Sequence, residues 1–111
     1  MPLEELSPRQ RAILERLQSR GFILVAFPMY ANYIGVRRGE CAALISAVEG
    51  AGFRIFGDPC ILISGNLSVR ITRAGKKWFV WKKQSLEVTP ERLAALAAFS
   101  QDLAALLRDI A

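Results

Sequence analysis

The sequence predicts an α+β domain in which antiparallel strands pack against helices, and three observations favour this class. A helix-start signal lies near the N-terminus, at Ser7-Pro8-Arg9-Gln10. Short apolar runs separated by Gly, Pro and Asn follow one another between residues 53 and 83, as in a β-meander. From Thr89 onwards the chain has the leucine and alanine spacing of one long helix.

The first helix is predicted to begin after Ser7 and to end at Gly21. Ser7 and Gln10 have the spacing of a capping box, and Pro8 suits the first helical position. Ile13 and Leu17 then share one helix face. The continuous apolar run of residues 22–27 that follows is typical of a buried strand.

The stretch of residues 28–36 is open to two interpretations, a short helix opened by Pro28 or a second strand paired with the first. A helix is predicted over residues 38–49. Ala42 and Ala43 raise the helical propensity there, although Gly39 is a poor residue near the start of a helix. The apolar residues of this segment recur at spacings of three and four, at Cys41, Leu44, Ile45 and Val48.

Strands are expected at residues 53–56 and 60–63, separated by the turn residues Gly57-Asp58-Pro59. Residues 67–72 alternate cleanly, and we expect Leu67, Val69 and Ile71 to point inward. A turn over Arg73-Ala74-Gly75-Lys76 leads to a return strand over residues 77–82.

The last helix is predicted to be capped by Thr89, with Pro90 at its first position. A helix this long and apolar either covers the domain core or packs against a second copy of itself. We expect the second, a homodimer contact through residues 90–110. Its apolar stripe comprises Leu93, Leu96, Leu103, Leu107 and Ile110.

Charge is distributed unevenly in this chain of net charge +5. Between residues 54 and 83 there are seven basic residues and one acid, Asp58. This favours a polyanionic partner such as nucleic acid. The alternative is a solvated strand face whose lysines protect against aggregation.

Composition argues against catalysis. The chain has no histidine, so the usual triads and the commonest metal ligand are missing. Cys41 and Cys60 are expected to be buried, unreactive thiols, and the acids are scattered. We therefore expect no enzyme activity, no cofactor and no metal site.

A single domain over residues 1–111 is expected from the length. The acidic start and the absence of a long apolar run predict a cytoplasmic protein without a membrane partner.

The segment Tyr30 to Arg38 resembles the centre of a helix-turn-helix. Ala31 lies four residues before Gly35, where two helices would cross closely, and Ile34 and Val36 flank that glycine. The opening residues 6–14 resemble the first helix of winged-helix regulators. Over residues 6–82 the chain thus resembles a winged helix-turn-helix DNA-binding domain, with residues 67–82 as the wing.

This resemblance implies a small, basic, regulatory DNA-binding protein, with phosphate contact better supported than readout of base sequence. The implied nucleic-acid-binding residues are Arg37, Arg38, Ser46, Arg70, Arg73, Lys76 and Lys77. The alternative fold keeps residues 29–36 as a strand, in the order αββαβββα. The alternative function is a protein-interaction or scaffold module that binds no nucleic acid.

The segment of residues 76–83 is the most distinctive in the chain. Trp78 and Val80 fall on one strand face and Phe79 and Trp81 on the other, framed by lysine pairs. Stacking of bases on these aromatics is one interpretation. We favour the other, a central strand buried on both faces.

Overall fold

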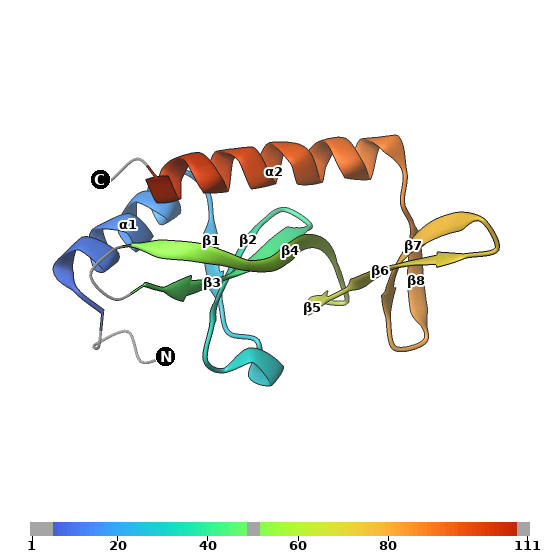
Figure 1. The fold of residues 1–111 in the computed structure, drawn as a ribbon, viewed down its shortest axis with the longest axis horizontal. Helices are drawn as coiled ribbons and strands as arrows, with labels where there is room; N and C mark the ends of the chain where they lie inside the picture. The colour runs from blue at the N-terminus through green and yellow to red at the C-terminus, as the bar shows by residue number, and fades with distance from the viewer. Residues whose placement is uncertain (1–5, 49–51, 109–111) are drawn as a thin grey trace.

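The computed structural model describes residues 6–48 and 52–108. They form two antiparallel sheets, two α-helices and one short 3-10 helix, which confirms the α+β class (Figure 1). The elements in chain order are α1 (Pro8–Ser19), β1 (Ile23–Val25), the 3-10 helix η2 (Pro28–Tyr30), β2 (Ile34–Arg38), β3 (Cys41–Ala47), β4 (Phe53–Ile63), β5 (Asn66–Leu67), β6 (Val69–Arg73), β7 (Lys76–Trp81), β8 (Gln84–Glu87) and α2 (Pro90–Arg108).

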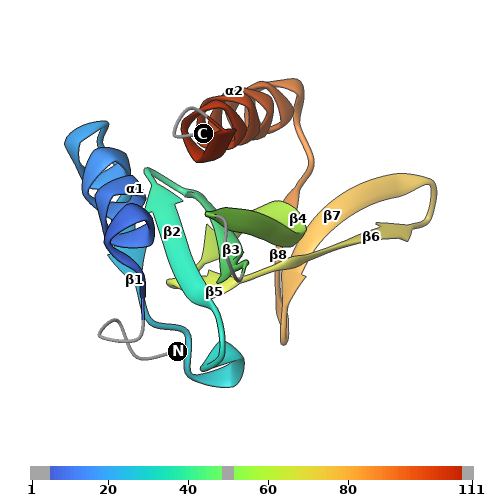
Figure 2. The same cartoon turned by 60° about the vertical axis from the view of Figure 1, so that its left-hand side comes forward.

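The larger sheet has five strands in the order β1-β2-β3-β4-β5, and the smaller has three in the order β6-β7-β8. Helices α1 and α2 lie on one face of the larger sheet, and the β6–β7 hairpin projects at the far end of the molecule from α1 (Figures 1 and 2). The molecule is therefore elongated, with dimensions of 47 × 26 × 20 Å.

Helix α1 forms as the sequence predicts. The Ser7 hydroxyl accepts a hydrogen bond from the Gln10 backbone N–H at 3.1 Å, and the Gln10 side chain accepts one from the Ser7 N–H at 3.0 Å. Ile13, Leu14 and Leu17 are buried. The capping box thus fixes where the helix starts, and its apolar face joins the core.

The helix predicted over residues 38–49 is wrong, because residues 41–47 form strand β3. The five residues from Cys41 to Ile45 are all buried. A strand covered on both faces has a continuous apolar run, and such a run contains the three- and four-residue spacings of a helix. Both of the predicted folds therefore have a helix where the protein has a strand.

Gly39 explains why this segment is not helical. It occupies a two-residue hairpin turn with Glu40 between β2 and β3. Its φ of +62° is the kind of backbone conformation that such turns require. The glycine that weakens the helix prediction is thus the signal of a hairpin. The predicted helix end at Glu49 and Gly50 lies outside the described residues.

Both interpretations of residues 28–36 are partly correct. Pro28 opens a single 3-10 turn, and β2 starts at Ile34. Gly35 faces the Phe27 ring so closely that a Cβ atom there would lie 2.4 Å from it. The glycine is thus explained by contact between a loop and a strand, and not by two crossing helices.

The second face of the larger sheet is covered by this same loop. Phe27 is buried against Ala42 and Leu44, with Tyr30 and Tyr33 packed beside it. The ring of Tyr33 stacks on Phe56 with centroids 4.3 Å apart. The larger sheet therefore lies between the helices and an aromatic loop.

Two details of the meander differ from the prediction. Residues 57–59 do not end a strand but form an irregularity within β4, where the register with β3 shifts. Strand β8 was not predicted, and residues 67–72 divide at Ser68 into β5 and β6. Ser68 is buried and donates a hydrogen bond to the Ile61 carbonyl, so the inward and outward positions exchange as the chain passes into the smaller sheet.

Helix α2 covers the core of its own chain. Thr89 caps it by accepting a hydrogen bond from the Arg92 N–H at 3.2 Å. Leu96, Phe99, Leu103 and Leu107 are buried within the main core, and Phe99 packs on Phe22 with centroids 5.6 Å apart. Most of the described residues of the predicted stripe thus pack against the core of their own chain. No helix among the described residues is long and apolar enough to cross a membrane.

Candidate nucleic-acid interface

The β6–β7 hairpin brings together four of the residues that the sequence analysis assigned to nucleic-acid binding. Its turn is Ala74-Gly75, and both residues have a positive φ. Arg73 pairs with Lys76 at the end of the hairpin, Thr72 pairs with Lys77, and Arg70 pairs with Phe79. The four basic side chains Arg70, Arg73, Lys76 and Lys77 are all exposed.

Residues that pair across antiparallel strands project to the same face of the sheet. Arg73 and Lys76 therefore share a face with Trp78, whereas Arg70 and Lys77 share the opposite face with Phe79. Phe79 is fully buried in the main core. The face with Phe79 is the inner one, and the face with Trp78 is the outer one.

The outer face of the smaller sheet is apolar and only partly covered among the described residues. Val69 is 61% exposed, and Ile71, Trp78 and Val80 are half-buried. The prediction that strand β7 is buried on both faces is therefore wrong, as is the expectation that Val69 and Ile71 point inward. The described part of the chain places no second layer against this face.

Electrostatic contacts on the outer face are weak. The Lys76 Nζ lies 3.9 Å from the Glu87 carboxylate, and both side chains are at least half-exposed. Such an ion pair contributes little to stability, so the lysine is available to another anion. Glu87 pairs with Trp78 across β7 and β8 and leaves one negative charge beside the indole.

On the inner face, the Arg70 guanidinium lies 5.7 Å from the centroid of the Phe79 ring. Arg70 thus covers the margin of the core while its charge remains in solvent. At the other end of β7, Lys82 lies 5.3 Å from the Trp81 ring centroid and turns the chain into β8 with a φ of +52°. These two cations extend the positive charge beyond the turn of the hairpin.

The three remaining predicted residues belong to the larger sheet. Arg38 ends β2, where its guanidinium forms an ion pair with Asp102 of α2 at 2.9 Å and lies 4.7 Å from the Phe22 ring centroid. Arg37 donates a hydrogen bond to the Gly39 carbonyl at 3.2 Å. Ser46 pairs with Arg54 across β3 and β4. The structure does not unite these residues with the hairpin.

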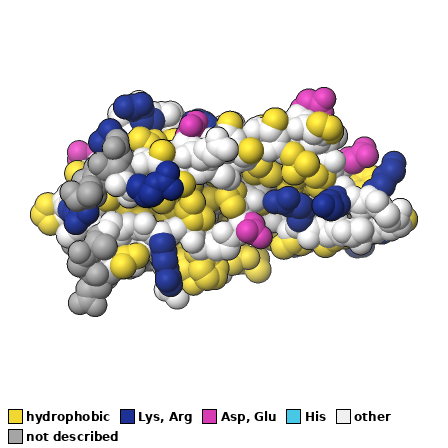
Figure 3. Space-filling model, turned by 45° about the horizontal axis from the view of Figure 1, so that its top comes forward, with side chains coloured by type: hydrophobic (Ala, Val, Ile, Leu, Met, Phe, Trp, Pro, Cys, Tyr) yellow, Lys and Arg dark blue, Asp and Glu magenta, His cyan; other side chains and the backbone are white. Residues whose placement is uncertain are grey.

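Trp78 belongs to the outer face but is absent from the predicted site. The alternation of β7 places it beside Lys76 on one face, and this could be deduced from the sequence. The sequence does not show which face of β7 is buried, because both faces are equally apolar. Figure 3 shows Lys and Arg side chains in separate groups over one side of the molecule, with hydrophobic side chains between them.

The thiols are buried, as predicted. Burial raises the pKa of Cys41 and that of Cys60 above the ordinary value of 9.0. The nearby Arg38 charge lowers the pKa of Cys41 and the Glu40 charge raises it, both less than burial does. Within residues 6–48 and 52–108, no three Cys, Asp or Glu side chains come together as a metal-binding group.

Comparison of this chain with protein-family models, with curated proteins and with solved structures found no match. Function is therefore inferred from the residues of the smaller sheet.

Proposed function

We propose that this protein binds nucleic acid through the outer face of the β6–β8 sheet. The observation that supports the proposal is the half-buried Trp78 on the same face as the exposed cross-strand pair of Arg73 and Lys76. An aromatic ring can stack on any base, and neighbouring cations can contact the phosphates on either side. The net charge of +5 adds a long-range attraction for a polyanion.

Nucleic acid remains the proposed partner, but the contacting element differs from the one that the winged-helix resemblance implies. In that resemblance Arg37 and Arg38 approach duplex DNA, with the β6–β7 hairpin as the wing. Arg38 is half-buried in the larger sheet, where its guanidinium contacts Asp102 and the Phe22 ring. The hairpin cations are exposed and lie together, so the hairpin is the better-supported contact. Stacking on Trp78 needs an unpaired base, so the proposal favours a single strand over a duplex.

The test is fluorescence anisotropy with a labelled mixed-sequence single strand and a duplex of equal length, titrated at several salt concentrations. We expect binding to the single strand that weakens as salt increases. Trp78→Ala removes the stacking surface and should cost about 1–3 kcal/mol of binding free energy, or roughly 5- to 150-fold in affinity.

The double variant Arg73→Ala, Lys76→Ala should lower the slope of log affinity against log salt. The expected change is about 0.7 for each phosphate of a single strand that the variant no longer neutralises. The charge-matched control is Arg20→Ala, Arg108→Ala, because both arginines are exposed near the ends of the helices. Equal losses in the control and the hairpin variant would indicate general attraction without a site. The absence of binding at low salt would contradict the proposal.

A protein partner is the second candidate, because Val69, Ile71 and Val80 also make the outer face apolar. Such a partner would supply a second layer for the small sheet. A protein ligand would be favoured over nucleic acid if its binding to this chain does not depend on salt concentration. That binding should also be lost in the Val69→Asp variant and be unchanged in the Arg73→Ala variant.

A further inference from the structure

Strand β1 lies at the edge of the larger sheet and pairs on one side only, with β2. Its other side leaves backbone N–H and C=O groups that can accept a further strand. Natural proteins that stay monomeric usually protect such an edge with charged side chains, proline or a bulge.

The edges of the described sheets differ in this protection. Strand β6 carries Arg70 and Arg73, and strand β8 carries Gln84 and Glu87. Residues 22–27 around β1 read Phe-Ile-Leu-Val-Ala-Phe and contain no polar or charged side chain. The other edge of the larger sheet, β5, has only two residues, Asn66 and Leu67. Among the edges of the described sheets, the three-residue β1 is therefore the one that lies in a wholly apolar run.

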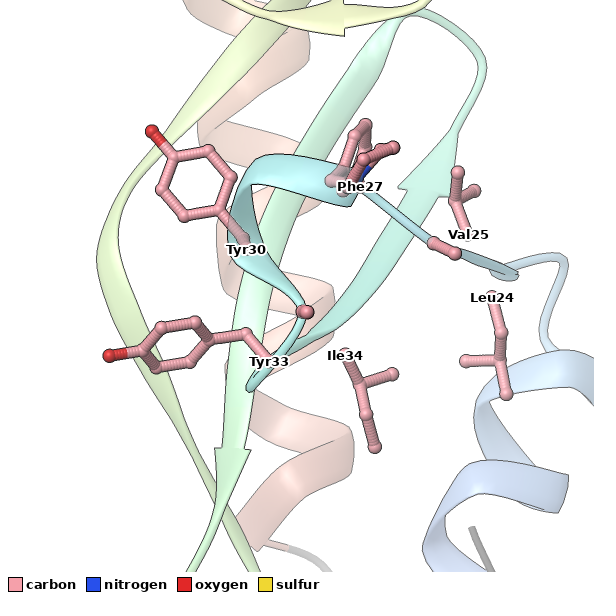
Figure 4. Close-up of a pocket in the computed structure, with 9 residues that line it drawn as sticks. Leu24, Val25, Phe27, Tyr30, Tyr33 and Ile34 are labelled. Carbon is pink, nitrogen blue, oxygen red and sulfur yellow. The ribbon is translucent and has the colours of Figure 1, made fainter. Parts of the chain in front are cut away.

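The β1 edge is also accessible to solvent, so the prediction of a buried strand over residues 22–27 is wrong: the strand spans Ile23–Val25 and has no buried residue. Ile23 is 56% exposed, Ala26 is exposed, and Leu24 and Val25 are half-buried. Beside the strand lies a hollow of about 360 Å³. Figure 4 shows its lining, which includes Leu24, Val25, Phe27, Tyr30, Tyr33 and Ile34.

We propose that two copies of this chain associate by pairing β1 with β1 in an antiparallel manner, which joins their sheets into one. A twofold axis perpendicular to the sheet keeps the helices of both copies on the same side. Two residues that pair across the axis must then point to the same face of the joined sheet. Because side chains alternate along a strand, the two residue numbers are both even or both odd, and their sum is even. Centred on β1, this register places Leu24 opposite Leu24 of the second copy.

The side chains around this register suit self-pairing. Ile23 meets Val25 of the second copy, a pair of β-branched residues that packs well on a pleated surface. Phe22 is buried in its own core and lies opposite the small, exposed Ala26, so this flanking pair places no bulky side chain between the two strands. Ile23 of the second copy then lies beside Val25 at the hollow, where its exposed apolar surface is covered.

This contact differs from dimerisation through residues 90–110. The buried stripe of α2 already packs within its own chain, so the outer face of that helix is what remains for a partner. Its exposed residues include Ala94, Gln101 and Ala105. The two contacts are distinguished by substitutions on different elements.

The test is sedimentation velocity of the full chain over a concentration series. We expect a monomer–dimer equilibrium in which Ile23→Lys weakens association by about tenfold or more, because it places a charge at the paired edge. Val69→Lys is the matched control, since Val69 is 61% exposed on the edge strand of the other sheet and should leave the dimer unchanged. A parent chain that stays monomeric over the series would overturn the proposal, as would a dimer that resists Ile23→Lys.

Two further variants locate the contact. Leu24→Cys should form a disulfide-linked dimer on mild oxidation, because each residue 24 faces its equivalent, whereas Val69→Cys should not. A dimer lost on Ala105→Glu but kept on Ile23→Lys would assign the contact to α2 instead. Trp78→Ala should leave association unchanged, so this proposal and nucleic-acid binding can fail independently.

Discussion

The two sheets of this chain differ in how many of their faces are covered. The five-stranded sheet has α1 and α2 on one face and the Phe27–Tyr33 loop on the other. The three-stranded sheet is buried against the core only on the face that carries Phe79. Strand β3 is accordingly buried from Cys41 to Ile45, whereas β6 has no buried residue.

Because of this difference, the residues that stabilise the fold and the residues that a partner can contact lie in different places. The larger sheet, covered on both faces, contributes many more buried hydrophobic residues than the smaller sheet, which contributes Phe79, and so more of the hydrophobic stabilisation. The smaller sheet keeps one apolar face and several cations in solvent, and those are the groups that a polyanion or a protein partner can contact. Substitutions in the buried core, to which Phe79 belongs, should therefore change stability, whereas substitutions on the outer face of the smaller sheet should change binding.

The largest effect is expected in the core beneath α2. Phe99→Ala removes a ring that is 1% exposed and packs on Phe22, and it should lower the free energy of unfolding by about 3–5 kcal/mol. Urea denaturation followed by circular dichroism measures the loss. Leu93→Ala on the same helix, where Leu93 is 40% exposed, is the control and should cost less than half as much. Equal losses would mean that α2 does not cover the core as described.

The next test compares the two faces of β7. Phe79→Ala should cost about 3 kcal/mol of unfolding free energy, because its side chain is fully buried. Trp78→Ala should cost less although tryptophan is the larger residue, since Trp78 is only half-buried on the outer face. The same denaturation experiment decides this, and a reversed order would show that the outer face is covered in solution.

A smaller loss is expected where α1 meets the larger sheet. The buried Gln10 amide donates hydrogen bonds to the carbonyls of Val48 and Gly52, at 3.2 and 3.3 Å, in addition to closing the capping box. Gln10→Ala leaves those carbonyls without this donor and should cost about 1–3 kcal/mol. Gln18→Ala, at an exposed position of α1, is the control and should change the midpoint little.

The smallest effect is expected for the ion pair between β2 and α2. Arg38→Ala breaks the contact with Asp102, whose side chain is 56% exposed, and should cost about 0–1 kcal/mol. We also expect Arg38→Ala to leave nucleic-acid affinity nearly unchanged in the anisotropy assay. A loss as large as that of Trp78→Ala would return the interface to the helix-turn-helix segment.

Prediction from the sequence succeeded where the signal is local. The Ser7–Gln10 capping box, the Ala74-Gly75 turn and the Thr89 cap each depend on residues within one turn of the chain. It failed for residues 38–49, where burial on two faces erased the alternation that distinguishes a strand from a helix. The candidate site was predicted in part, since four basic residues of the hairpin come together and Arg37, Arg38 and Ser46 lie in the other sheet.

Local sequence signals are enough to define the α+β class, both helices, the β6–β7 hairpin with its cations and the burial of the two thiols. Those features follow from capping, turn chemistry and apolar periodicity, which act over a few residues. Long-range packing was needed to place Trp78 outward and Phe79 inward, to fold α2 onto its own chain, and to leave β1 at an open edge. Which face of a strand is buried depends on what packs against it, and those partners are distant in the sequence.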